Sequence, residues 1–181
     1  MARIDYFDPE KAPDHIIRAM GGKKKLGIFR MIANAENAAP EVLDLGKKLS
    51  VGTSLPHDIR EVVILRVGYL SKATYEIKQH TAVARRVGLS DEMITAIGEY
   101  PESDFAFSQE HLDYLKFTDA VVADTTPDDE IFNRVAARLD KSQLVELVLL
   151  IGFYMMVSRV MNTFEIDLET GPVESFSLKL D

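Results

Sequence analysis

The sequence predicts an all-α protein, and three features of the chain support this fold class. Long stretches carry apolar residues at helical spacing, residues that commonly cap helices precede them, and almost no stretch alternates apolar and polar residues as a strand does. A buried helical pattern also occurs twice, because REVVILRVGY, from Arg60, matches VELVLLIGFY, from Val145. Two such helices, at about 57–71 and 142–164, are expected to pack together around a pseudo-two-fold core. The alternative is that two unrelated buried helices share common hydrophobic residues.

The N-terminal part of the chain, residues 1–54, is expected to form a helical arm. Proline and glycine positions predict three short helices in this arm, at about 14–20, 29–34 and 38–49. The arm is then connected by a loop to the main part of the chain.

The main helical domain is expected over residues 55–166, organised around a hairpin from Pro56 to Gly88. The first helix of the hairpin is apolar on nearly every side and must therefore be buried, and Ser71 or Thr74 is available to cap the second helix. The remaining helices are predicted from their caps: Ser90 before a helix at 91–98, Ser108 before one ending near 123, Thr126 with Pro127 before one ending near 139, and a capping box of Asp140 and Gln143 before one ending near 164. Residues 167–181 are expected to form an extended C-terminal tail.

The composition is that of a globular protein and excludes several function classes. With 46% hydrophobic residues, a net charge of -8 and a pI near 5.0, the chain lacks the basic surface that nucleic acids and anionic membranes require. The one basic run, Lys23 to Lys25, is interpreted as a solvated loop. The longest apolar stretch, Leu144 to Val157, contains Glu146 and is expected to be too short to span a bilayer. No secretory signal is recognised, so a cytoplasmic location is expected.

Three ionisable residues of the hairpin are the candidate functional group. Glu61 lies in the buried first helix, so its carboxylate needs a hydrogen-bond donor from elsewhere or a raised pKa. Glu76 and His80 stand one turn apart on the predicted inward face of the second helix. His80 is a candidate general acid or base, because imidazole titrates near neutral pH. Structural alternatives are a core His80 bonded to Glu61, a Glu61 paired with a buried arginine such as Arg66, and an exposed local pair of Glu76 and His80.

Two tyrosines near this group are candidates for binding a substrate through their hydroxyl groups, Tyr75 and Tyr69, although a buried tyrosine is more often a core residue with one hydrogen bond. In the second copy of the repeat, Glu146 and Tyr154 are interpreted as structural counterparts of Glu61 and Tyr69, without a functional role.

A metal site is an alternative use of Glu61, Glu76 and His80, since two carboxylates and one imidazole suit zinc or non-haem iron. The spacing of a duplicated Glu-x-x-His carboxylate site is absent from the sequence, so neither a metal nor another cofactor is predicted.

Several of these residues occur in a recognisable order between about Leu55 and Glu165. The order is Leu55-Pro56, Arg60-Glu61, a buried helix, Tyr75-Glu76, His80, Gly88-Leu89-Ser90, and then Phe107 with Leu112 and Phe117. This order resembles the carboxymuconolactone decarboxylase family, which includes the alkylhydroperoxidase D-like proteins. The resemblance implies an all-α fold, assembly into a homo-oligomer, and a pocket near Glu61 and His80.

The resemblance also distinguishes two branches of that family. The peroxidase branch uses a glutamate, two cysteines separated by two residues, and a histidine four residues after the second cysteine. Overlaid on this chain, Glu61 and His80 take the outer positions, while Ala73 and Glu76 stand where the cysteines would be. Because the chain contains no cysteine, a dithiol peroxidase mechanism is excluded. In the decarboxylase branch, a histidine and neighbouring carboxylates handle protons around a small lactone acid.

Two hypotheses of function follow. The first is a decarboxylase or lyase acting on a small carboxylated or lactone substrate, with His80 as acid and base, Glu61 as its orienting partner, and Glu76, Tyr75 and Tyr69 binding the substrate. The alternative is a non-catalytic helical oligomer that binds a small molecule or a partner protein. In this hypothesis the same residues form a buried polar contact that only stabilises the fold.

Overall fold

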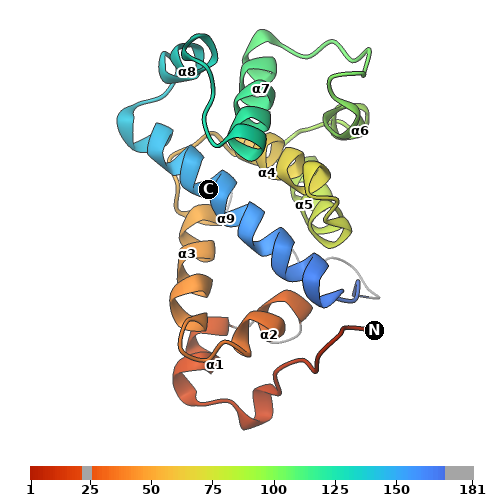
Figure 1. Ribbon diagram of the computed structural model, residues 1–181, viewed down its shortest axis with the longest axis vertical. Helices are drawn as coiled ribbons and strands as arrows, with labels where there is room; N and C mark the ends of the chain where they lie inside the picture. Colours follow the sequence, from red (N-terminus) through yellow and green to blue (C-terminus); the bar gives the residue numbers. More distant parts are fainter. Residues whose placement is uncertain (22–25, 170–181) are drawn as a thin grey trace.

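Nine α-helices and one short 3-10 helix form the described part of the protein, and no strand occurs there (Figure 1). The computed structural model describes residues 1–21 and 26–169. The elements are η1 (Pro9–Lys11), α1 (Asp14–Met20), α2 (Gly27–Ala33), α3 (Ala39–Val51), α4 (His57–Leu70), α5 (Thr74–Arg86), α6 (Asp91–Glu99), α7 (Gln109–Asp124), α8 (Asp129–Ala136) and α9 (Lys141–Phe164). The predicted all-α fold class is confirmed. The basic run Lys23 to Lys25 and most of the predicted tail lie outside the described residues.

Helix α4 is the central element of the fold. It packs against α5, α6, α7 and α9, and every residue from Ile59 to Gly68 is buried. A helix that is apolar on all sides has no face suited to water, so it is stable only where other helices surround it. Three charged residues of α4, namely Arg60, Glu61 and Arg66, are therefore held inside the protein.

The two copies of the repeated pattern pack against each other, as predicted. Leu147 and Leu150 of α9 share one core cluster with Ile64 and Val67 of α4. Residues 144–157 alone were expected to be too short to span a bilayer, but helix α9 is longer, with 24 residues. By length and apolar composition α9 could cross a membrane, a test that the core helices of soluble proteins also pass.

The N-terminal arm covers the C-terminal half of α9. Helices α1, α2 and α3 pack together and form one apolar cluster with Val157 and Met161 of α9 and with Tyr75 of α5 (Figure 1). The arm thus reaches α5, the helix that carries Glu76 and His80, through Tyr75. The division of the chain at residues 54 and 166 stays a prediction.

Three of the predicted helix starts are confirmed by their hydrogen bonds. Ser90 and Ser108 each accept the backbone N–H three residues further on, at the starts of α6 and α7. At the start of α9, Asp140 and Gln143 form both hydrogen bonds of the predicted capping box. These caps are local interactions, which explains why the sequence alone identifies them.

Two predicted caps are wrong. Helix α5 begins after Ala73, and neither Ser71 nor Thr74 caps it with a side-chain hydrogen bond. The cap of α8 is Asp128 instead of Thr126, because the Asp128 carboxylate accepts the N–H three residues on at 2.8 Å. Other helix bounds differ from the predicted ones by a few residues.

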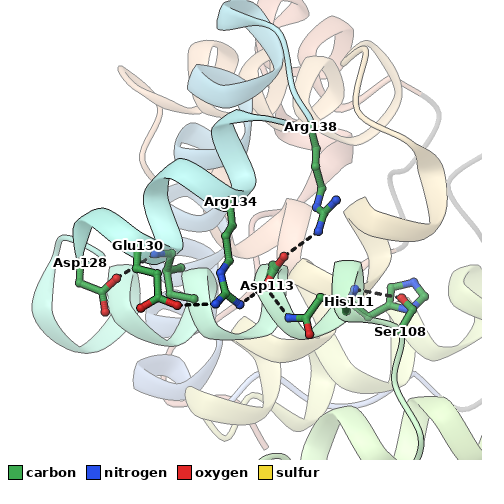
Figure 2. Close-up of polar contacts among 9 residues, drawn as sticks. Ser108, His111, Asp113, Asp128, Glu130, Arg134 and Arg138 are labelled. Atoms are coloured by element: carbon green, nitrogen blue, oxygen red, sulfur yellow. Dashed lines mark hydrogen bonds and ion pairs between the residues drawn. The ribbon is translucent and has the colours of Figure 1, made fainter.

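A buried carboxylate ties α8 to α7. Figure 2 shows Asp113 of α7 facing Arg134 and Arg138, and Gln109 also donates to it. The Arg138 Nη2 donates to Asp113 Oδ2 at 2.8 Å, and Asp113 is fully buried. Burial alone would raise the pKa of Asp113, but the hydrogen bonds from Arg138, Gln109 and Arg134 outweigh it and lower that pKa. This network is structural, since it lies among α7 and α8.

Candidate functional site

Glu61 has two buried partners. The His80 Nδ1 donates to Glu61 Oε2 at 2.7 Å, so α5 supplies the hydrogen-bond donor that the buried Glu61 carboxylate needs. The Nε of Arg60, the preceding residue on α4, lies 3.3 Å from Glu61 Oε1. The alternative of a buried arginine partner for Glu61 is thus met by Arg60, whereas Arg66, the example named from the sequence, pairs with Asp119 at 2.6 Å.

Glu76 is the second carboxylate partner of His80. The His80 Nε2 lies 2.9 Å from Glu76 Oε1, one turn earlier on α5. All three side chains are buried, so the alternative of an exposed local pair is wrong. Glu61, His80 and Glu76 thus form one continuous hydrogen-bonded chain, which we call the carboxylate–imidazole chain.

The proton in this chain resides on His80. Burial alone would lower the pKa of His80, but the charges and hydrogen bonds of Glu61 and Glu76 outweigh burial and raise it to about 10. At neutral pH the ring is therefore an imidazolium that donates from both nitrogens. The positive charges of His80 and Arg60 offset those of the Glu61 and Glu76 carboxylates. Charged groups can be buried in an apolar interior only when they are paired in this way.

A cavity of about 50 Å³ adjoins one end of the carboxylate–imidazole chain. It lies between the arm and helices α5 and α9, and its lining is mostly apolar: Leu26, Ile28, Phe29, Ile32, Val42, Leu43, Gly46, Tyr75, Glu76, Gln79, Phe153, Tyr154, Val157 and Met161. Glu76 lines the cavity, whereas Glu61 and His80 do not. A group inside the cavity therefore meets Glu76 first, and His80 lies behind it.

The structure brings one of the two candidate tyrosines to this cavity. Tyr75 lines it and donates its hydroxyl hydrogen to Glu169 at 2.5 Å. Tyr69 lies elsewhere, on the side of α4 that packs against α6, where its ring fills the space above Gly98. The structure thus gathers four of the five predicted site residues, and Tyr69 is the one it does not bring there.

Three residues near the site had no assigned role from the sequence. Tyr154, interpreted from the sequence as a structural counterpart of Tyr69, lines the cavity and meets the His80 ring edge-on at 5.1 Å between centroids. Burial and the charges of Glu76 and Glu61 raise the pKa of Tyr154 well above its usual value, so it stays protonated. Gln79 also lines the cavity, and Arg60 is fully buried with both Nη atoms lacking a hydrogen-bond partner within the described residues.

The repeat did not predict the position of Tyr154. Its counterpart Tyr69 packs against α6, whereas Tyr154 meets the His80 ring, so the two tyrosines have different neighbours. Gln79 adjoins His80 in sequence, but nothing in its sequence neighbourhood marks it as part of a cavity wall.

No group of three histidine, cysteine, aspartate or glutamate side chains within the described ranges is arranged to hold a metal ion. Both ring nitrogens of His80 are instead within hydrogen-bond distance of carboxylates.

Part of the chain is similar in sequence to a known family and to a bacterial protein. Residues 41–110 match the sequence model of the carboxymuconolactone decarboxylase family, a range that contains Glu61, Glu76 and His80. The chain is also 28% identical over 108 residues to the uncharacterized protein YdfG of Bacillus subtilis, covering 59% of this chain and 73% of that protein.

Solved structures with the same fold include alkylhydroperoxidase-like proteins. An uncharacterized peroxidase-related protein from Ralstonia eutropha JMP134, described as an alkylhydroperoxidase AhpD core, superposes with a TM-score of 0.79 at 14% identity over 93% of each chain. A peroxidase-related protein from Silicibacter sp. TM1040 gives 0.77 at 16% identity, over 97% of this chain and 95% of that one. A cysteine-to-alanine variant of the debrominase Bmp8, in complex with 2,3,4-tribromopyrrole, gives 0.74 at 16% identity, over 94% and 95%. The predicted AhpD-like fold is confirmed.

Proposed function

Because residues 41–110 match the sequence model of the carboxymuconolactone decarboxylase family, we propose that the protein is an enzyme of decarboxylase type acting on a small carboxylated or lactone substrate. One observation carries this proposal: the buried carboxylate–imidazole chain of Glu61, His80 and Glu76 ends at a cavity. An imidazolium that donates to a carboxylate at the edge of a cavity can deliver its proton to a bound molecule through that carboxylate.

In this proposal, Glu76 is the catalytic residue that touches the substrate, and His80 acts through it. This differs from the sequence hypothesis, in which His80 was the acid and base and Glu76 only bound the substrate. Glu61 and Arg60 keep the imidazole oriented and its charge balanced, so they are positioning residues.

The proton transfers balance in a decarboxylation. When the C–C bond to the carboxyl group breaks, carbon dioxide leaves and the electron pair stays on the substrate carbon. His80 passes its Nε2 proton to Glu76, and Glu76 passes a proton to that carbon. The mostly apolar lining excludes bulk water, so a competing solvent proton has little access. Water restores the proton on His80 after product release.

The size of the substrate is bounded by the cavity. A volume of about 50 Å³ has room for a few water molecules, so a ring-sized acid requires some widening. The Bmp8 complex with a halogenated pyrrole supports a small ring as the class of ligand.

The second candidate function is the non-catalytic helical oligomer. Its supporting observation is a row of exposed apolar side chains on α9, which would suit a subunit contact: Val145, Val148, Leu149 and Met156. In that case the carboxylate–imidazole chain would serve only stability.

A substrate panel with matched variants tests the proposal. Carbon dioxide release from small lactone acids and unsaturated dicarboxylic acids is measured for the wild type, Glu76→Gln and His80→Gln. We expect the turnover number to fall at least 100-fold in both variants, the scale of general acid–base catalysis. Glu146→Gln is the control, since Glu146 occupies the same position in the repeat as Glu61 but bonds Ser54 away from the cavity. Equal turnover in all variants would overturn the assignment.

A further inference from the structure

The protein holds one of its own carboxylates in a set of converging donors beside the cavity. Glu169, in the segment after α9, accepts from the Tyr75 hydroxyl at 2.5 Å, from Gln79 Nε2 at 3.1 Å and from the backbone N–H of Gly27 at 2.9 Å. The Lys78 Nζ donates to the backbone carbonyl of Glu169 at 2.8 Å. We call Tyr75, Gln79 and the Gly27 N–H the carboxylate cradle.

The cradle is a built part of the cavity wall. Tyr75 is 4% and Gln79 is 6% exposed, and both also line the cavity. Leu26 and Ile28, the neighbours of Gly27, line it as well. Burial, together with the hydrogen bond and charge of Glu169, raises the pKa of Tyr75, so its hydroxyl stays protonated and donates. Donors buried at a cavity edge need an acceptor, because leaving them unpaired is costly.

The segment that delivers Glu169 is anchored by the buried Ile166, whereas Asp167 beyond it is joined to the N-terminal arm by exposed polar contacts with Ala2 and Tyr6. Its other ion pairs are exposed: the N-terminal amino group with Asp167, and Arg3 with Glu165. Exposed ion pairs contribute little stability because water solvates and screens them. Residues 167–169 lie beyond Glu165 and Ile166, whose backbone N–H groups close the end of α9, so release of Glu169 leaves those hydrogen bonds in place.

We propose that the cradle is the subsite for the carboxylate of the substrate, and that Glu169 occupies it as an internal ligand until a substrate displaces it. The inference rests on the proposed function for the fate of the bound acid, since the same cavity brings that acid to Glu76. The cradle offers neutral donors in a fixed arrangement, which favours an ionised carboxylate over an amide or an ester. Departure of the Glu169 side chain also supplies the widening that a ring-sized acid needs.

Internal occupation predicts a measurable competition. A free carboxylate binds only the fraction of molecules in which the cradle is empty, so its apparent dissociation constant is the intrinsic one divided by that fraction. If Glu169 fills the cradle in about nine molecules of ten, removal of its carboxylate tightens binding about tenfold.

Propionate is the probe, because it carries the same carboxyl-bearing chain as glutamate, and propionamide is its uncharged counterpart. Binding is measured by titration calorimetry at neutral pH and constant ionic strength for the wild type, Glu169→Ala and Glu169→Gln. We expect both variants to bind propionate at least tenfold more tightly than the wild type and to bind propionamide no better. Glu165→Ala is the matched control, since it removes a carboxylate of the same segment that lies outside the cradle.

The assignment to Tyr75 is tested in the Glu169→Ala background. Adding Tyr75→Phe removes one donor, and we expect propionate binding to weaken at least fivefold while far-ultraviolet circular dichroism stays that of the folded helices. Equal propionate affinity in the wild type and both Glu169 variants, or an affinity insensitive to Tyr75→Phe, would overturn the proposal. Propionate binding to Glu169→Ala that persists after adding His80→Gln would support the subsite even where the turnover tests reject proton transfer.

Discussion

Raising the pH should destabilise this protein through one residue. The pKa of His80 is raised to about 10 in the folded protein, whereas an unfolded histidine titrates near 6.5. Between these values the folded state holds one proton more than the unfolded state, so the free energy of unfolding falls as pH rises. The stabilisation is complete below about pH 6.5 and is lost by about pH 10.

The magnitude follows from the size of the shift. Each pKa unit corresponds to about 1.4 kcal/mol, so the whole contribution of His80 is on the order of 5 kcal/mol. The slope should approach about 1.4 kcal/mol per pH unit in the middle of the window. A loss of this size is a large fraction of the stability of a typical domain.

Urea unfolding followed by circular dichroism at a series of pH values measures this slope. Other groups also titrate in alkali, so the quantity of interest is the difference between the wild type and His80→Gln. His15→Gln, at an exposed position, is the matched control and should keep the wild-type slope. If His80→Gln does not fold, Glu76→Gln provides the comparison. Loss of one carboxylate should lower the pKa of His80 and so narrow the pH range over which the stability falls. A wild-type stability that stays flat across this range, or that falls equally in His80→Gln, would refute the reasoning.

The remaining predictions concern the helices around the site. Asp113→Asn should lower the free energy of unfolding by about 1–3 kcal/mol in urea melts, because Asp113 is buried and accepts charge-assisted hydrogen bonds; a change within error would contradict its role in fixing α8. Gly98→Ala should cost about 1–3 kcal/mol, since an added Cβ would lie 2.6 Å from the Tyr69 ring. Gly152→Ala, where a Cβ meets nothing within 4 Å, should instead stabilise α9 by about 0.5–1 kcal/mol, and thermal melts of this pair must shift in opposite directions. A homo-oligomer is expected in sedimentation velocity, and Leu149→Glu on the exposed apolar row of α9 should dissociate it; a monomeric wild type at micromolar concentration would remove that proposal.

The sequence predicted the features of the fold that local interactions determine. Ser90, Ser108 and Asp140 marked helix starts because a cap bonds to a residue three positions away. The burial of α4 followed from its composition, and the contact of Glu61 with His80 followed from the need of a buried carboxylate for a donor.

The parts of the site that depend on distant chain segments were not predicted. Glu169 is 90 residues from Gln79, and nothing in its own neighbourhood in sequence marks it as a ligand of the cradle. The role of Glu76 at the cavity edge depends on how residues of α2, α3 and α9 form the cavity beside α5, which no sequence periodicity predicts. Tyr69 was selected with Tyr75 for its hydroxyl group, but α4 packs against several helices and Tyr69 lies on the side that faces α6.

The central claim is that the side chain at position 76 connects the cavity to a proton held on His80. A Glu76→Cys variant tests it directly, because the chain has no other cysteine and the thiol is therefore a unique probe. Burial in an apolar wall raises a thiol pKa, whereas an adjacent imidazolium lowers it, so the two influences give opposite results.

The measurement is the rate of alkylation of Glu76→Cys by a small neutral reagent as a function of pH. We predict a reactive thiolate with a pKa well below the usual value of about 8.5, and a return to that value or above when Glu61→Gln is added. A thiol that reacts only above about pH 8.5, or only after unfolding, would contradict the claim.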